Sequence, residues 1–215
     1  MPVPSTEIEG ASIVLVGNFN PAIFQPSWLG THGIVRPEEA EDAKINLISS
    51  EVTSFSTEWL ALQSTRDRFH VSTSDVRYFD RLVEVVLSAF TLLEHTPVHK
   101  LGINRDMHFP ASIEYRNRFA EILAPKVHWR SLFEEPLLET LIMQGRREHS
   151  QAKLVRITIQ PSLRVQPGIY IGSNEHFEVE GEQTPQKILR LLAESWTGAQ
   201  TYAKRVAEDL LAQAE

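Results

Sequence analysis

The chain has 215 residues, 42% hydrophobic and 23% charged, with a formal net charge of −7, as is ordinary for a globular protein with a sizeable core. It contains no cysteine, which excludes disulfides, thiolate metal sites and cysteine nucleophiles and fits a reducing compartment. The negative charge opposes general binding to the nucleic-acid backbone, with a local basic patch as the alternative.

Residues 1–10 predict a short flexible lead, because they have neither the basic start nor the apolar core of a secretory signal. The longest apolar stretch, residues 82–90, is interrupted by Glu84 and Ser88, so no membrane contact is expected. We therefore expect a cytoplasmic protein in which residues 11–215 form a single α+β domain.

The first half, residues 11–95, predicts a strand, a short helix, three strands and a long helix. The apolar run at 12–19 predicts a buried strand, and Asn20-Pro21 predicts the start of a short helix that Gly30 ends. An acidic connector is expected at 36–44. The three antiparallel strands are expected at 45–55, 58–65 and 68–73, and the helix at 76–94, where apolar residues recur every three or four positions.

The second half, residues 97–213, predicts the same order of elements. A strand at 98–109 precedes a helix at 112–123, and Thr184-Pro185 predicts the start of a closing helix that runs to residue 212. Gly198 interrupts this helix, so a kink or a close approach by another backbone is expected there. The three strands between the helices are expected at 137–147, 153–160 and 168–180.

These elements predict an α+β fold with an antiparallel sheet built from two pseudo-repeats of strand, helix, three strands and helix. The long helices are expected to pack on one face of that sheet. The order of elements resembles the duplicated saddle of the TATA-binding-protein class, although no side-chain motif accompanies the likeness.

Two polar strand ends provide the candidate site. Alternation along 102–109 puts Asn104, Asp106 and His108 on one face of a strand, and along 172–177 it groups Asn174 with His176. If the two strands are neighbours, Asp106, His108 and His176 could supply metal ligands or an acid–base pair. The alternative is that these residues are polar groups of a sheet face that hydrogen-bond to one another. No cofactor or catalytic residue is predicted, because the Walker-A, G-x-G-x-x-G, G-x-S-x-G and H-E-x-x-H motifs are absent.

The basic residues that could bind phosphate are mostly arginines. Arginine suits phosphate and carboxylate, but ordinary salt bridging with the 28 acids is the simpler interpretation. The arginines in question are Arg66, Arg68, Arg105, Arg116, Arg118, Arg146 and Arg147.

Five segments carry a resemblance to a known group of proteins. They are Gly17-Asn-Phe-Asn-Pro21, Trp59-Leu-Ala-Leu-Gln63, Asp67-Arg-Phe69, Leu101-Gly-Ile-Asn104 and Asn174-Glu-His-Phe177. Together they resemble a sporadically distributed family of uncharacterised bacterial proteins. The resemblance assigns no catalytic residue, and the patchy distribution implies mobile-element or phage-defence cargo.

Three functional hypotheses follow from these observations. The first is a non-catalytic protein-binding or assembly module of the bacterial cytoplasm, which acts by binding another protein or by self-association into a homo-oligomer. The second is a small metal-dependent hydrolase or nuclease using Asp106, His108 and His176. The third is a saddle-like nucleic-acid-binding protein.

Overall fold

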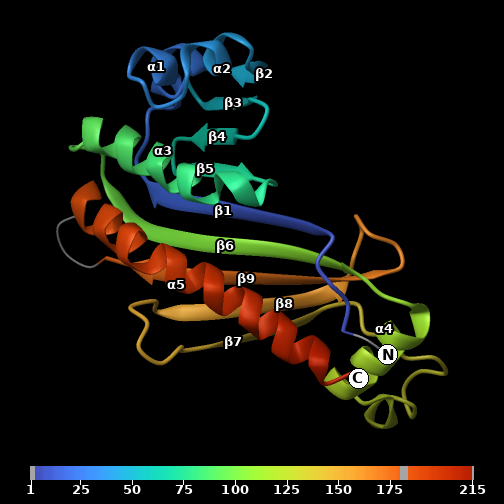
Figure 1. Cartoon of the computed structure of the whole chain (residues 1–215). Helices are drawn as coiled ribbons and strands as arrows, with labels where there is room; N and C mark the ends of the chain where they lie inside the picture. Colours follow the sequence, from blue (N-terminus) through green and yellow to red (C-terminus); the bar gives the residue numbers. More distant parts are fainter. Residues whose placement is uncertain (1–2, 180–183, 215) are drawn as a thin grey trace.

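The strands form one antiparallel sheet whose centre joins the two halves of the chain. The computed structural model describes residues 3–179 and 184–214, and in this part nine strands follow the order β2-β3-β4-β5-β1-β6-β9-β8-β7 (Figure 1). The strands are β1 (Ile8–Gly17), β2 (Lys44–Ile48), β3 (Val52–Ser56), β4 (Ala61–Thr65), β5 (Arg68–Thr73), β6 (Val98–Pro110), β7 (Leu141–Gly145), β8 (Leu154–Pro161) and β9 (Gly168–Glu178). The predicted α+β class with an antiparallel sheet is confirmed.

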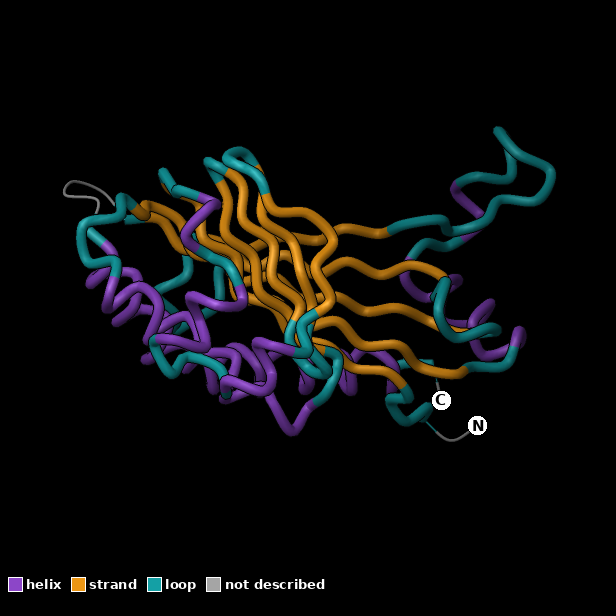
Figure 2. Tube along the Cα trace, turned by 90° about the horizontal axis from the view of Figure 1, so that it is seen from above, coloured by secondary structure: helices purple, strands orange, loops and turns teal. Residues whose placement is uncertain are grey.

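The described residues also form five α-helices. They are α1 (Pro26–Thr31), α2 (Pro37–Glu41), α3 (Phe79–Leu92), α4 (Ile113–Leu123) and α5 (Pro185–Ala212). Viewed along the sheet, the helices gather on one side of most strands (Figure 2). The predicted helices at 112–123 and 184–212 are confirmed, with Ser112 Oγ accepting from the Tyr115 amide as the cap of α4.

Apolar side chains between the helices and the sheet form the core. Four phenylalanines pack at the first half of the sheet, with ring centroids 4.7–6.4 Å apart: Phe19, Phe24, Phe69 and Phe90. In the second half, Leu192 and Trp196 of α5 are almost fully buried against the same core. Such packing holds each strand's position along the sheet, because a one-residue shift would turn its apolar side chains to solvent.

Two arginines, the buried Arg105 and the partly buried Arg147, tie the helices to the strands. Arg105 of β6 pairs with Glu9, donates to the Gln200 carbonyl of α5 at 3.1 Å and lies 5.4 Å from the Phe79 ring of α3. Arg147, in the β7–β8 connection, pairs with Glu175 of β9 at 2.8 Å.

Arg147 also reaches α5 at the glycine that the sequence marks. It donates to the Gly198 carbonyl at 3.0 Å and lies 4.8 Å from the Tyr202 ring. A Cβ atom at position 198 would lie 3.6 Å from Arg147 Nη2. The segment that approaches Gly198 is therefore an arginine side chain and not the backbone that the sequence led us to expect.

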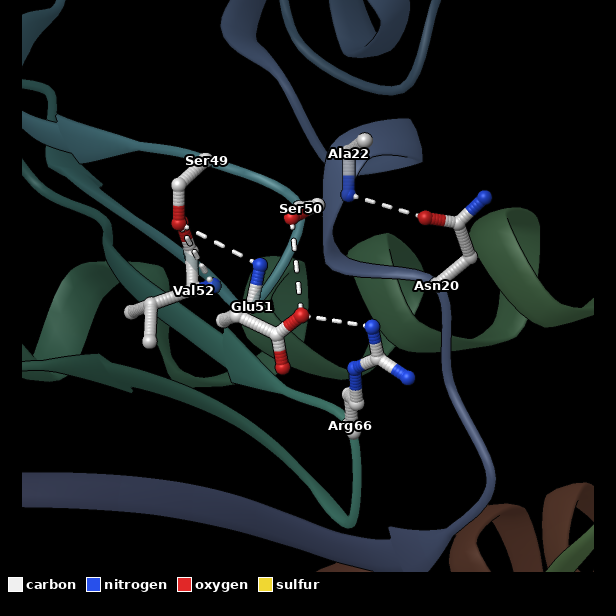
Figure 3. A network of polar contacts seen from close by, with 7 residues as sticks. All are labelled: Asn20, Ala22, Ser49, Ser50, Glu51, Val52 and Arg66. Carbon is white, nitrogen blue, oxygen red and sulfur yellow. Dashed lines mark hydrogen bonds and ion pairs between the residues drawn. The ribbon is translucent and has the colours of Figure 1, made fainter.

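The first half contains four strands after its short helices, so the prediction of three is wrong. Ser49 Oγ accepts hydrogen bonds from the amides of Glu51 at 3.2 Å and Val52 at 3.0 Å, and this turn divides residues 45–55 into β2 and β3 (Figure 3). Glu51 also pairs with Arg66 at 2.5 Å, which ties this turn to the one before β5. The side chain of Ser49 thus replaces the glycine that usually marks a tight turn.

Smaller differences occur near the start of the chain. β1 begins at Ile8, so the end of the expected flexible lead belongs to the sheet. Asn20 caps a short 3₁₀ helix as expected (Figure 3), but a separate helix, α1, then begins at Pro26 and runs through Gly30 to Thr31, so Gly30 does not end it. The acidic connector contains α2, whose Glu39 accepts from the Arg36 amide. The expected end of the last strand at residue 180 lies outside the described residues.

Candidate functional site

One face of the sheet, defined here as the open face, is the face toward which the even-numbered residues of β6 point. On β6, odd-numbered residues such as Leu101 and Ile103 are buried toward the helices, and even-numbered residues point the other way. Because β6 and β9 are paired neighbours, the five candidate residues share this open face: Asn104, Asp106, His108, Asn174 and His176. The sheet therefore brings the two polar strand ends together in one surface.

A row of polar side chains crosses the centre of the open face. The strand register aligns Ser72, Ser12, Asn104, Asn174 and Arg156. Asn174 donates to Asn104 Oδ1 at 2.6 Å, and Asn104 donates to the Ser12 carbonyl at 3.3 Å. The two asparagines thus bond to each other and to the sheet, as the structural alternative supposed.

Asp106 is held by a tyrosine from the neighbouring strand. Tyr170 donates its hydroxyl hydrogen to Asp106 Oδ1, and burial raises the pKa of Tyr170, with the Asp106 hydrogen bond and charge adding to the rise. The tyrosine reaches Asp106 by lying over Gly172, where a Cβ atom would be 2.2 Å from the hydroxyl oxygen. Gly172 is therefore the residue that makes the Tyr170–Asp106 contact sterically feasible.

We expect Gly172→Ala to lower the free energy of unfolding by about 1–3 kcal/mol, because the new methyl group displaces Tyr170 from Asp106. In a Tyr170→Ala background the same substitution should change the free energy of unfolding little, since the displaced ring is absent. Urea denaturation of both single variants and the double variant forms a double-mutant cycle. Equal losses in the two backgrounds would contradict the displacement.

The two candidate histidines do not converge, so the proposed ligand set is wrong. His108 stands opposite Tyr170, whereas His176 stands opposite Gly102, six residues away along β6. At ~3.3 Å per residue this separation is roughly 20 Å, far beyond the reach of one metal ion. No group of three or more histidine, aspartate or glutamate residues in the described part of the chain could hold a metal.

Each histidine has its own local partner instead. His108 Nδ1 lies 2.8 Å from Ser162 Oγ, and burial, assisted by the Arg164 charge, lowers the pKa of His108, so the ring is neutral near pH 7. His176 Nε2 lies 3.1 Å from Glu178 Oε1. Lys153, His176 and Lys100 together hold the pKa of Glu178 at about 2. The two histidines therefore do not form the acid–base pair that was one of the alternatives from the sequence.

A shallow hollow of about 290 Å³ remains between the histidines of the open face. His70 and His176 flank it, and Val14 and Gly102 lie between them in the strand register. Burial lowers the pKa of His70. The lining of the hollow carries Arg68 and Lys100 as well as Asp106, so charges of both signs share it and give it no clear preference for an ionic ligand.

Three of the seven arginines singled out in the sequence are held by acidic residues and do not converge on one groove. Arg66, Arg105 and Arg147 are engaged in ion pairs with Glu51, Glu9 and Glu175. They also lie in different places: a hairpin turn, the helix side of β6 and the β7–β8 connection. Salt bridging with local acids, the simpler interpretation of these arginines, describes all three.

The surface that sequence reasoning missed is an apolar arm, defined here as residues 126–140, between α4 and β7. In Figure 2 the arm extends away from the rest of the chain, at the upper right. Its apolar side chains have large exposed fractions: Val127 65%, Trp129 46%, Leu132 68%, Phe133 57% and Leu137 80%. Isolated exposed apolar residues are ordinary, but a group of this kind in one segment marks an interaction surface.

Two apolar hollows lie between the arm and the body of the protein. Their volumes are about 410 and 280 Å³, and both are lined by Ala120, Leu137 and Leu138. The sequence feature that could have revealed the arm is Trp-Arg-Ser-Leu-Phe at 129–133. This stretch is rich in large apolar residues, lies between Pro125 and Pro136, and has neither helical nor strand periodicity. A stretch of this kind that cannot enter the core is a candidate for binding.

Among the described residues, no helix combines the length and the apolar composition needed to cross a lipid bilayer.

No family model matches the chain, and a search of curated proteins likewise gives no match. Comparison with known proteins therefore adds no assignment to these observations.

Proposed function

We propose that this protein is a non-catalytic protein-binding or assembly module of the bacterial cytoplasm. The observation that carries the proposal is the apolar arm, with Trp129, Leu132 and Phe133 about half or more exposed. Aromatic residues and arginine are enriched at protein interfaces, and the arm contains Arg130 beside its aromatic residues. The same segment carries three glutamates, Glu134, Glu135 and Glu139, against two cations, Lys126 and Arg130, and this balance favours a protein over a nucleic acid or an anionic membrane.

The arrangement of the sheet supports the same proposal. On our interpretation, the two halves are pseudo-repeats with four and three strands after their first helical segments, and the long helices pack on one face. The strand order on either side of β1–β6 supports this interpretation. A sheet braced in this way is a rigid base from which the arm and the open face can present their side chains.

The two alternatives have weaker support. A metal-dependent hydrolase requires convergent ligands, and His108 and His176 lie far apart on the open face. A saddle-like nucleic-acid binder would use this face, where Arg68 and Arg156 are exposed but Lys100 is paired with Glu178 at 3.2 Å. The mobile-element or phage-defence association stays a prediction from the family resemblance.

A photo-cross-linking amino acid at position 133 tests the proposal in the bacterial cell of origin. We expect irradiation to join position 133 to a protein and to give a covalent adduct of discrete mass, because Phe133 lies in the interface. Position 76 is the matched control, since Val76 is 53% exposed at the start of the segment leading into α3 and lies outside the arm. Mass spectrometry of the adducts identifies the joined chain.

Two outcomes would count against the proposal. Adducts of equal yield at positions 133 and 76 would show that contact at the arm is random collision. A purified protein that binds DNA or RNA tightly, with an affinity that falls steeply with salt, would favour the saddle-like alternative.

A further inference from the structure

Strand β7 is an edge strand with both of its faces exposed. In the described part of the chain it is the last strand of the sheet and pairs only with β8, from Leu141 opposite Ile159 to Gly145 opposite Val155 (Figure 1). Ile142 on one face is 54% exposed, and Met143 on the other is 62% exposed. Such a strand presents a row of backbone N–H and C=O groups together with apolar side chains, which is a template for another strand.

The opposite edge of the sheet is protected in the ways that natural edge strands are. β2 begins with Lys44, and its pairing with β3 shifts register between Ile45 and Leu47. A charged residue and a bulge both discourage pairing with another chain. β7 has neither device, because Leu-Ile-Met-Gln-Gly contains no charge and no proline, and its register with β8 is regular. The two edges therefore differ in their readiness to bind a strand.

We propose that β7 pairs antiparallel with β7 of a second copy of this chain, joining two sheets into one. This inference rests on the proposed assembly function and names its partner. A twofold axis normal to the sheet would keep the helices of both copies on the same side. If this axis passes through Met143, the middle residue of β7, then Met143 of one copy lies opposite Met143 of the other. Ile142 of each copy then lies opposite Gln144 of the other.

Charge complementarity supports the antiparallel direction. Glu139 precedes β7 and Arg146 follows it, and both side chains belong to exposed residues. Neither forms an ion pair within the part of the chain that the structure describes. Antiparallel pairing places the Glu139 end of each β7 beside the Arg146 end of the other, so opposite charges meet twice. A parallel arrangement would place like charges together.

The apolar arm extends the same interface. It leads directly into β7 through Thr140, so pairing of the two strands brings both arms to the junction of the sheets. The exposed Leu137 and the two hollows beside it then lie next to the second copy. Burial of these side chains supplies the apolar area that five residues of backbone pairing lack, because a lone strand pair is only marginally stable in water.

Because the chain has no cysteine, a single introduced cysteine reports the pairing directly. We expect Met143→Cys to form an intermolecular disulfide under mild oxidation, since residues directly opposite in paired strands lie within disulfide reach. Ile45→Cys on β2 is the matched control, with a similar exposed fraction of 58%, and should stay largely uncross-linked. Non-reducing electrophoresis measures both.

Sedimentation of cysteine-free variants gives the second measurement. The wild-type protein should sediment as a dimer, and Met143→Glu should weaken the dimer at least roughly tenfold, because two like charges then face each other. Ile45→Glu should leave the dimer unchanged. A wild-type monomer up to roughly 100 μM, or a dimer unaffected by Met143→Glu, would overturn the β7 pairing. If the wild-type protein is a monomer while a different protein is joined to position 133 in the cell, the assembly function survives and this inference fails.

Discussion

The variant Phe90→Ala should lose about 3–5 kcal/mol of unfolding free energy, because a large buried aromatic side chain is replaced by a methyl group. Phe90 is fully buried on α3, and its ring centroid lies 5.0 Å from that of Phe69 and 5.8 Å from those of Phe19 and Phe24. The substitution therefore leaves a cavity bounded by three rings that belong to different elements. Leu192→Ala on α5 should cost about 2–5 kcal/mol for the same reason.

Leu92→Ala is the control for Phe90→Ala, because Leu92 lies on the same helix but is 51% exposed. Its effect should stay within about 0.5 kcal/mol. Thermal and urea denaturation compare the three variants with the wild-type protein. Unchanged stability in both Phe90→Ala and Leu192→Ala would show that the helices do not pack as described.

We expect Arg147→Ala to be as costly, at about 3–5 kcal/mol, because it leaves the carboxylate of Glu175 buried without its cation. Only 1% of the Glu175 side chain is exposed, and Arg147 is the only cation among the described residues that pairs with it. The change also removes the hydrogen bond to the Gly198 carbonyl and the contact with the Tyr202 ring. Urea denaturation near pH 7 measures the loss.

The loss should depend on pH in a definite direction. Burial raises the pKa of Glu175 above the ordinary value of a glutamate side chain, while Arg147 and Ser150 oppose the rise. Without Arg147 the pKa rises further, so the folded protein keeps a proton that the unfolded chain has released. Stability then falls as pH increases through this window, and the deficit of Arg147→Ala should be smaller near pH 5 than near pH 7.

Two variants serve as comparisons for Arg147→Ala. Arg190→Ala removes an exposed arginine of α5 and should change the free energy of unfolding by no more than about 0.5 kcal/mol. Adding Glu175→Gln to Arg147→Ala removes the unpaired charge and should recover part of the loss. A deficit that is independent of pH, with no recovery in the double variant, would mean that the buried carboxylate is not its cause.

The elements with a clear period were predictable from the sequence. The stripe of apolar residues in α5, the Thr184-Pro185 start and the Ser112 cap depend on local chemistry that a sequence displays. The turn at Ser49 was missed because a serine side chain makes it, and serine is also common in strands. The α2 helix was missed because its acidic residues also suit a solvated connector, and its Glu39 bond to the Arg36 amide is visible only in three dimensions.

The candidate site was predictable in part, for a related reason. Alternation gives the face of a strand, so Asn104 and Asn174 could be placed on one surface. Register decides which residues meet across strands, and the sequence of a single chain does not encode it locally. Because the register pairs Gly102 with His176 and Tyr170 with His108, the two histidines lie far apart. The Tyr170–Asp106 contact was not predictable either, because it requires a glycine at position 172 over which the tyrosine ring can lie. The apolar residues of the arm follow no helical or strand periodicity, so the sequence predicts no element there. Their exposure depends on the tertiary fold, because the other elements do not pack over them.

The position of β1 next to β6 has a consequence for how the protein is made. Ser12 and Asn104, which lie opposite each other at the centre of the sheet, are 92 residues apart in the chain. A nascent chain leaving the ribosome can pair β1 with β5 early, but the other edge of β1 has no partner until β6 has emerged. Contacts of such long sequence separation form slowly, and an open central edge invites pairing with other chains. Interrupted translation before residue 98 should therefore yield a fragment that aggregates or binds a chaperone. The strand edge that lies at the centre of the complete sheet is thus the edge most exposed to wrong pairing while the chain is still being made.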